Sequence, residues 1–401
     1  MKKRNLFKNL KQKKNYKCPV CKTNIQNDII IKEIINLPKY PITEFYRKKN
    51  EQLILESFKN QKVMFCKKCD HMFLKNILDV GKIYSNYITS SNSSRGAVLC
   101  LENFHKFINK TNKKKKFCNF IDIGGNDSSL LNLFNNHYGK KINIDPNASS
   151  KDKNIILKKI FLEDVDFKEF YNLKGKNVYV SSHTLEHLED PFKLLSNLSI
   201  NFKMNDTIYL QFPSLEKLVQ HRRFDQICHQ HINYFSLYSI SELLNKLNLF
   251  IEDFEYDTSH FGTLRLKIKK NLKKKNKFKK INLFNETLNS YKLFKEYYDN
   301  LQNNLKKIFE NGQGYGAGLM VPILAYHLPL INNLRVIIDE NRTKNDKKFI
   351  NLEPIIKNLK GLDKNKPIII TSISTKEAGR NIFNKLSNLG IKDICLPSMV
   401  I

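Results

Sequence analysis

Residues 120–134 read FIDIGGNDSSLLNLF, and this stretch decides the fold class of the chain. The apolar run up to Asp122 has the composition of a buried β-strand. Gly124 and Gly125 allow a tight turn into the helical pattern that follows. In a doubly wound sheet such a turn lies at the carboxyl end of the first strand, where ligands bind. The spacing is not GxGxxG and no P-loop lysine follows, so a phosphate-cradling loop is not expected.

Short β-branched runs alternate with helical segments outward from this turn, between residues 117 and 269. The expected strands are FCNFIDIGG, KINIDPN, KNVYVSSHT, DTIYLQFP, LFIEDFEYD and TLRLKIK. This alternation predicts a doubly wound α/β sheet, a Rossmann-like domain. The last two runs follow each other closely, so we expect a hairpin with an antiparallel strand at the sheet edge.

Acidic side chains gather where the first two of these strands end. Asp122 and Asp127 lie at the glycine turn with Asn126, and Asp145 follows the second strand in INIDPN. A carboxylate at Asp145 can accept hydrogen bonds from both hydroxyls of a ribose. The acids of the turn suit a cofactor with a cationic centre and an amino-acid moiety. Together they predict a site for S-adenosylmethionine (SAM); the alternative is an ordinary tight β–α turn.

Two CxxC pairs lie near the amino terminus, CPVC at 18–21 and FCKKC at 65–69. Two such pairs supply the four sulfur ligands that Zn²⁺ prefers in a tetrahedral site. A four-sulfur shell leaves no position for water, so the expected role of the metal is structural. The four predicted ligands are Cys18, Cys21, Cys66 and Cys69. His71 follows closely and is expected to be a bystander.

Composition limits the kinds of partner. The 401 residues carry a net charge of +31, from 69 Lys+Arg against 38 Asp+Glu. The excess is lysine with abundant asparagine and isoleucine, which AT-rich codons produce, whereas base readout favours arginine. We therefore expect a small-molecule substrate and no nucleic-acid or membrane partner. No apolar stretch is long enough for a transmembrane helix, and the basic amino terminus lacks an apolar core segment. A cytoplasmic monomer is expected.

The domain limits follow from shifts in pattern. We expect a zinc-binding domain over residues 1–95, a Rossmann-like domain over 96–270 and a smaller Rossmann-like unit over 271–401. The Lys-rich stretch 267–280 marks the second boundary. The third unit opens with a long helical pattern and contains NGQGYGAGLMVP at 311–322. Its glycine spacing is irregular, so we expect a structural turn there and not a dinucleotide site.

The segment SSHTLEHLEDPFKLL at 181–195 contains His183, Glu186 and His187, which spell HxxEH. That motif binds zinc in inverse zinc proteases, where it lies inside a helix. Here it directly follows the strand NVYVSS, so we reject that interpretation. The segment is expected to form the loop after the fourth strand, beside the cofactor.

The segment FDQICHQHINYFS at 224–236 contains His229, His231 and Tyr234. A histidine acting as a general base near neutral pH is the commonest catalytic use of this side chain. A metal site formed by the paired histidines, or two surface histidines on a loop, are the alternatives.

The order of these motifs resembles the three-domain sugar C-methyltransferases, which have a zinc-binding domain, a central SAM domain and a Rossmann-like carboxyl-terminal domain. FIDIGGNDSS resembles their cofactor motif I-G-x-N-D-G, and the two CxxC pairs resemble their zinc site. IYSNYITSSNSS at 83–94 resembles a Tyr- and Ser-rich segment. FDQICHQHINYFS resembles D-x-I-Y-H-E-H-x-x-Y-F-S, and SHFGTLR at 259–265 resembles H-G-G-S-L-R. GYGAG and VIIDEN resemble landmarks of the third domain.

The resemblance implies methylation of carbon 3 of a nucleotide-linked 4-keto deoxysugar. His231 would be the general base, with His229 and Tyr234 beside it. The implied cofactor residues are Asp122, Gly124, Gly125, Asn126, Asp127, Asp145 and His187. Cys228 and Gln230 stand where the family motif has Tyr and Glu. An oxygen or nitrogen methyltransferase for a related sugar, an RNA-modifying methyltransferase and a non-catalytic SAM-binding protein stay open as alternatives.

Overall fold

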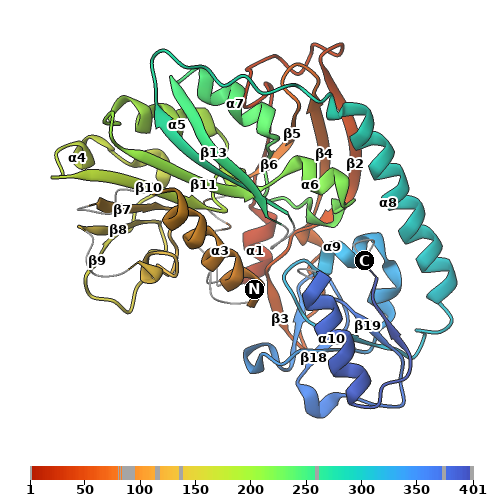
Figure 1. Ribbon diagram of the computed structural model, residues 1–401. Helices are drawn as coiled ribbons and strands as arrows, with labels where there is room; N and C mark the ends of the chain where they lie inside the picture. Colours follow the sequence, from red (N-terminus) through yellow and green to blue (C-terminus); the bar gives the residue numbers. More distant parts are fainter. Residues whose placement is uncertain are drawn as a thin grey trace.

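A computed structural model describes residues 2–79, 81, 83, 95–112, 118–134, 139–257, 262–372 and 376–397. Three larger sheets organise these residues (Figure 1): a seven-stranded central sheet, a four-stranded amino-terminal sheet and a seven-stranded carboxyl-terminal sheet. A two-stranded antiparallel ribbon pairs β1 (Gln12–Lys14) with β6 (Asn76–Leu78).

The central sheet has the strand order β13-β14-β11-β10-β7-β8-β9. Its strands are β7 (Cys118–Ile123), β8 (Lys141–Ile144), β9 (Ile155–Lys158), β10 (Lys176–Ser182), β11 (Thr207–Pro213), β13 (Leu249–Asp257) and β14 (Thr263–Lys270). Strands β7 and β11 are buried along their whole length, as expected for parallel strands covered on both faces. The predicted doubly wound α/β sheet is confirmed.

The predicted hairpin is confirmed, but its place in the sheet differs from the prediction. β14 is antiparallel to both of its neighbours, β11 and β13. The antiparallel strand therefore lies one position in from the edge, and β13 is the edge strand. Because two successive antiparallel pairings restore the direction, β13 runs parallel to the rest of the sheet.

Helices of the central part connect these strands and cover the sheet (Figure 1). They are α3 (Arg95–Thr111), α4 (Lys168–Tyr171), α5 (Pro191–Ile200), α6 (Leu215–Gln220) and α7 (Leu237–Asn245). Local capping signals determine where two of these helices begin. The Asp190 side chain caps α5, and Ser236 and Ser239 form a capping box at α7. Apolar side chains of α3, including Phe104 and Ile108, pack against Phe120 of β7.

The amino-terminal sheet has the order β12-β5-β4-β2. Its strands are β2 (Ile31–Pro41), β4 (Phe58–Cys66), β5 (His71–Leu74) and β12 (Asn233–Tyr234), and α1 (Lys2–Lys8) precedes it in the chain. β12 comes from the central part of the sequence and pairs with β5, so the segment that carries His231 is anchored on the amino-terminal sheet.

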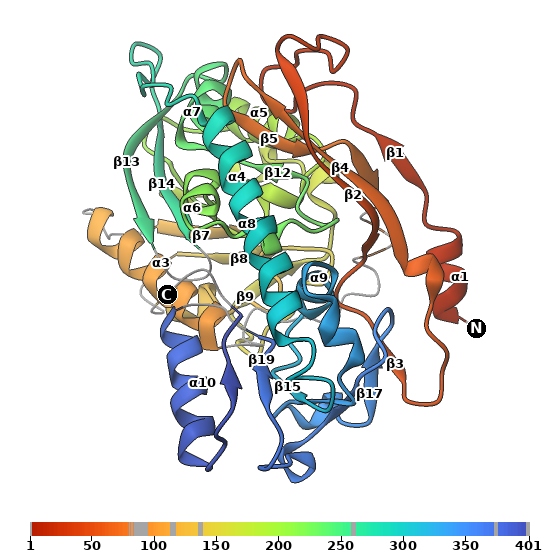
Figure 2. The same cartoon turned by 90° about the vertical axis from the view of Figure 1, so that its right-hand side faces the viewer.

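The carboxyl-terminal sheet has the order β20-β19-β15-β16-β18-β17-β3. Its strands are β3 (Tyr46–Lys48), β15 (Gln313–Tyr315), β16 (Val336–Ile338), β17 (Lys347–Phe349), β18 (Ile355–Lys357), β19 (Ile368–Ile370) and β20 (Ile394–Cys395). Its helices are α8 (Leu283–Leu305), α9 (Val321–His327) and α10 (Lys376–Asn388). The long helix α8 runs from the level of α7 down to this sheet (Figures 1 and 2).

Strand β3 belongs to the amino-terminal part of the sequence but pairs with β17 of the carboxyl-terminal sheet. Together with β12, it ties the first part of the chain to both other parts. The domain limits 95/96 and 270/271 stay a prediction. Within the described residues, no helix combines the length and the apolar character that crossing a membrane requires.

Candidate cofactor and acceptor site

The glycine turn after β7 is held against the end of β8 by hydrogen bonds. The Gly124 N–H donates to the carbonyl of Ile144 over 2.8 Å. The carboxylate of Asp145 accepts from the Asn126 N–H at 3.2 Å and from the Asn147 N–H at 2.7 Å. The predicted cofactor residues of the turn and Asp145 therefore lie together at the carboxyl ends of two adjacent parallel strands.

The side chains of Asp122, Asp127 and Asp145 gather in a poorly solvated place at this turn and the neighbouring end of β8, where their negative charges would repel one another. Asp122 is only 2% exposed. Burial, together with the negative charges of Asp145 and Asp127, raises the pKa of Asp122 to about 8. Burial also raises the pKa of Asp145. A cationic ligand would relieve this repulsion, and SAM carries a sulfonium and an ammonium group. The residues present fit SAM in this respect.

Gly124 cannot be replaced without strain, because its φ is +80° and its neighbours are close. A Cβ there would lie 2.2 Å from the Thr184 hydroxyl oxygen and 2.7 Å from the Thr184 methyl carbon. The Thr184 hydroxyl in turn donates to the carbonyl of Ile123 at 3.3 Å. The glycine turn and the loop after β10 are thus packed directly on each other.

Gly124→Ala is therefore expected to lower the free energy of unfolding by at least about 2 kcal/mol, from the left-handed backbone and the contact with Thr184 together. Gly390→Ala is the matched control, because Gly390 has φ +87° and no heavy atom lies within 4 Å of the place where its Cβ would stand. It should show only the backbone effect of about 1 kcal/mol. Equal losses in urea unfolding of both variants would contradict the close packing of Thr184 on the turn.

The loop after β10 brings His187 to His231. The HxxEH segment is not helical: His183 follows β10, and Glu186 and His187 lie in a short 3₁₀ turn, Leu185–His187. The rings of His187 and His231 are 4.8 Å apart and nearly perpendicular. The Nδ1–H of His187 donates to the carbonyl of Gln230 at 2.9 Å, which leaves the lone pair on Nε2. His187, predicted for the cofactor, thus lies beside the predicted base.

The surroundings of His231 keep it neutral. Burial, helped by the nearby His187 and opposed by Glu186, lowers the pKa of His231 to about 3. The Tyr234 ring centroid lies 6.4 Å from that of His231, and the Tyr234 hydroxyl oxygen accepts the Cys228 N–H at 3.4 Å. Burial raises the pKa of the Cys228 thiol to about 12, so this thiol is protonated at neutral pH.

The ring of His229, predicted to assist His231, contacts the amino-terminal sheet through both of its nitrogens. The residue is 1% exposed, and its ring contacts the Gln61 amide through Nδ1 at 3.1 Å and the Tyr40 carbonyl through Nε2 at 3.1 Å. The Gln230 amide likewise donates to the Thr43 hydroxyl at 3.2 Å. Both side chains are thus engaged with the amino-terminal part of the chain, and the geometry favours a structural role for His229.

Three polar side chains that the sequence analysis did not connect, those of Cys100, His183 and Glu186, contact one another at the same loop. The Cys100 thiol lies 3.6 Å from Nε2 of His183, and Nδ1 of His183 lies 3.2 Å from Glu186. Burial opposes the charge on His183, but hydrogen bonds and charges of Cys100 and Glu186 raise its pKa to about 10. Burial would raise the pKa of Glu186, yet His183 lowers it to about 2. Glu186 is therefore an ionised, buried carboxylate.

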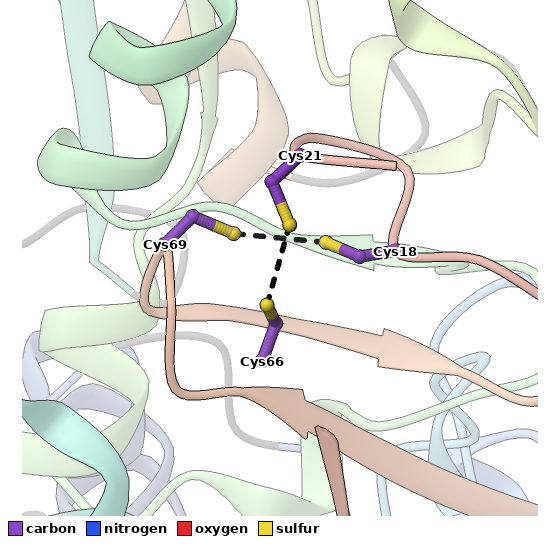
Figure 3. Close-up of side chains that lie close together, drawn as sticks. All are labelled: Cys18, Cys21, Cys66 and Cys69. Carbon is purple, nitrogen blue, oxygen red and sulfur yellow. Dashed lines mark hydrogen bonds between the residues drawn. The ribbon is translucent and has the colours of Figure 1, made fainter. Parts of the chain in front are cut away.

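The four predicted zinc ligands converge (Figure 3). Cys18 and Cys21 come from one loop, Cys66 ends β4, and Cys69 lies in the turn between β4 and β5. The sulfur atoms of Cys18 and Cys69 are 3.6 Å apart, and those of Cys21 and Cys66 are 3.5 Å apart. Zn–S bonds of ~2.3 Å in a tetrahedron imply sulfur separations of ~3.8 Å, so these side chains could hold a zinc ion.

The glycine-rich turn of the third unit is filled by a side chain of the protein. The Ala317 N–H donates to the Asp339 carboxylate at 2.6 Å, and Lys344 donates to the Ala317 carbonyl at 2.8 Å. A Cβ at Gly316 would lie 2.5 Å from the Ser372 Cβ. Asp339 thus accepts a backbone N–H that a bound phosphate would otherwise use, which favours a structural turn over a dinucleotide site.

Two segments of the family resemblance fall wholly or partly outside the described residues. Apart from Ile83, the stretch IYSNYITSSNSS lies outside them, as do Ser259, His260 and Phe261 of SHFGTLR. Arg265, which is described, is 3% exposed and pairs with Glu255 at 2.8 Å and with Asp257. It joins β14 to β13.

Comparison with known proteins gives the class of the central part. Residues 94–253 match a family model described as a methyltransferase domain. Together with the described strands of the central sheet, of which β14 alone is antiparallel, this shows a methyltransferase domain on a Rossmann-like sheet.

A particular relative is the C-methyltransferase NovU of Streptomyces niveus, 20% identical over 211 residues, which are 50% of this chain and 49% of NovU. The chain thus matches about half the length of this curated relative. Among solved structures, the magnesium protoporphyrin IX methyltransferase of Synechocystis PCC 6803 is 13% identical, with 44% of this chain and 84% of that chain covered at a TM-score of 0.33. A SAM-dependent methyltransferase of Leishmania major is 14% identical, with 45% and 79% covered at 0.34.

Proposed function

We propose that the protein is a SAM-dependent methyltransferase that methylates carbon 3 of a nucleotide-linked 4-keto deoxysugar or a related small acceptor, with His231 as general base. The observation that carries this proposal is the packing of Thr184 on the glycine turn, which lies beside the acids proposed to bind SAM. The loop of Thr184 also carries His187, whose ring lies 4.8 Å from that of His231. The methyltransferase domain at 94–253 and the similarity to NovU support it.

SAM, when bound, supplies an electrophilic methyl group. Asp145 would hold its ribose, and the acids of the glycine turn would hold its amino-acid end. His231 would take the proton beside the ketone of the acceptor, which would make that carbon nucleophilic. His231 is neutral, so its lone pair can accept a proton. Because its lowered pKa makes the free imidazole a weak base, the bound acceptor would have to raise that pKa for efficient proton transfer. Positioning of the two substrates would provide most of the rate.

The other parts of the chain have supporting roles in this proposal. Zn²⁺ at the four cysteines would hold the amino-terminal sheet, on which β12 anchors the His231 segment. The net charge of +31 suits an acceptor with a diphosphate, such as a nucleotide sugar.

Oxygen or nitrogen methylation of a related sugar is a second candidate. It is favoured by Gln230, because an amide that bonds Thr43 cannot stabilise a histidinium by charge.

The test is methyl transfer from labelled SAM to a panel of nucleotide-linked 4-keto deoxysugars, with the new bond located by NMR. His231→Gln should lower turnover about 10²- to 10⁴-fold and leave SAM affinity unchanged. His221→Gln, at the end of α6, is the control and should stay active. If His231→Gln turned over as fast as the unaltered protein, His231 would not be the general base.

The pH dependence gives a further check on the base. The folded pKa of His231 is about 3, below its ordinary value, so the neutral form persists as pH falls from 7 to 5. Hence kcat/KM should show no loss attributable to His231 in that window.

A further inference from the structure

The loop after β10 and the β12 segment place three metal-ligating side chains together. Glu186, His187 and His231 each offer one ligand atom, and all three atoms lie within 4.8 Å of one another. This group is separate from the four cysteines and is one of two such groups found in the part of the chain that the structure describes. Metal bonds of ~2.1 Å would bring the three atoms to ~3.4 Å, so small side-chain rotations would close the site.

The carboxylate of Glu186 has one oxygen without a partner. Its Oε1 accepts from His183 at 3.2 Å, whereas its Oε2 is buried with no hydrogen-bond partner among the described residues. The residue as a whole is 1% exposed. A buried carboxylate oxygen without a partner is costly unless a cation or a hydrogen-bond donor reaches it.

The ligands also have the outer partners that metal sites require. A metal-ligating histidine commonly donates its other ring N–H to a carbonyl or carboxylate, which fixes the ring and its tautomer. The Nδ1–H of His187 donates to the Gln230 carbonyl at 2.9 Å, so Nε2 is the ring nitrogen that carries no hydrogen in this tautomer. His183 fixes Glu186 in the same way. His187 and His231 are half-buried, so both residues retain some contact with solvent.

We propose that Glu186, His187 and His231 bind a divalent transition-metal ion, Zn²⁺ or Co²⁺, as a second metal site at the acceptor side of the sheet edge. Two imidazoles and one carboxylate are a ligand set that zinc accepts with its fourth position open. Binding itself does not rest on the proposed function. The expected effect of the metal on activity does rest on the proposed function. A bound ion takes the His231 lone pair, so it inhibits a reaction in which His231 is the general base.

The experiment is a titration of the zinc-loaded full chain with Co²⁺, followed by visible absorption and by metal content after dialysis. The proposal predicts a second equivalent with ligand-field bands and without the thiolate-to-cobalt charge-transfer band of a cysteine site. His187→Ala and the nearly isosteric Glu186→Gln should lose this equivalent. His183→Ala, which removes an outer partner, should weaken it about 10- to 100-fold.

His221→Ala, outside the cluster, is the control and should bind as the unaltered chain does. Thermal melts of each variant establish that it is folded. Absence of a second equivalent in excess Co²⁺, or equal affinity in Glu186→Gln and the unaltered chain, overturns the metal site. Neither result touches the transferase assignment, which fails separately if SAM does not bind or no acceptor is methylated.

Discussion

Replacing Asp145 with alanine is expected to weaken SAM binding about 10²- to 10⁴-fold. The carboxylate lies at the carboxyl end of β8, oriented by the N–H groups of Asn126 and Asn147. Two hydrogen bonds from ribose hydroxyls to a charged acceptor are worth about 3–6 kcal/mol together, and alanine removes both. Isothermal titration calorimetry with SAM measures the change directly.

Two further variants separate loss of contacts from loss of structure. Asp145→Asn keeps one carbonyl acceptor and should bind SAM more tightly than the alanine variant. Glu163→Ala removes an exposed carboxylate of the same domain and should change nothing. If the alanine variant bound SAM as tightly as the unaltered chain, Asp145 would not hold the ribose.

Removing one zinc ligand is expected to have the largest effect on stability. Cys66→Ser should destabilise the amino-terminal part by several kcal/mol, because structural zinc sites contribute on the order of 10 kcal/mol to folding. Cys118→Ser, which changes a buried thiol outside the cluster, is the matched control and should lose only about 1 kcal/mol. Thermal unfolding with and without a chelator measures both.

Loss of zinc should disturb the proposed acceptor side of the site more than the proposed cofactor side. β12 pairs Asn233 with Phe73 and Tyr234 with Met72, only two residues after His231. Loss of zinc should therefore lower methyl transfer more than SAM affinity. A chelated chain that unfolds at the same temperature as the zinc-loaded one would contradict a structural metal.

The strands that carry the cofactor site can be predicted because each is a buried apolar run with its own local pattern. β9 is not among the predicted strands: it lies at the sheet edge, and its Ile156 and Leu157 are 43% and 38% exposed. β3 and β12 are not predicted either, because they have three and two residues and are fixed by partners distant in sequence. Nothing in such short segments signals which sheet they join.

The residues of the candidate site likewise fall into those that local sequence predicts and those that only the folded chain brings together. The glycine turn, Asp145 and the cysteines have spacings with direct physical meaning, and the structure brings each group together. The contact of His187 with His231 depends on the path of more than forty intervening residues. The contact of Cys100 with His183 depends on the path of more than eighty. His229 shows the limit of local reasoning, since its ring is held by Gln61 of β4 and Tyr40 of β2.

The central claim is that SAM binds where β7 and β8 end, and native mass spectrometry tests it most directly. The purified chain should carry one zinc ion as isolated and gain an adduct of the mass of SAM, or of its demethylated product. Asp145→Ala should keep the zinc and lose the adduct. A chain that holds zinc but forms no adduct in excess SAM would contradict the account.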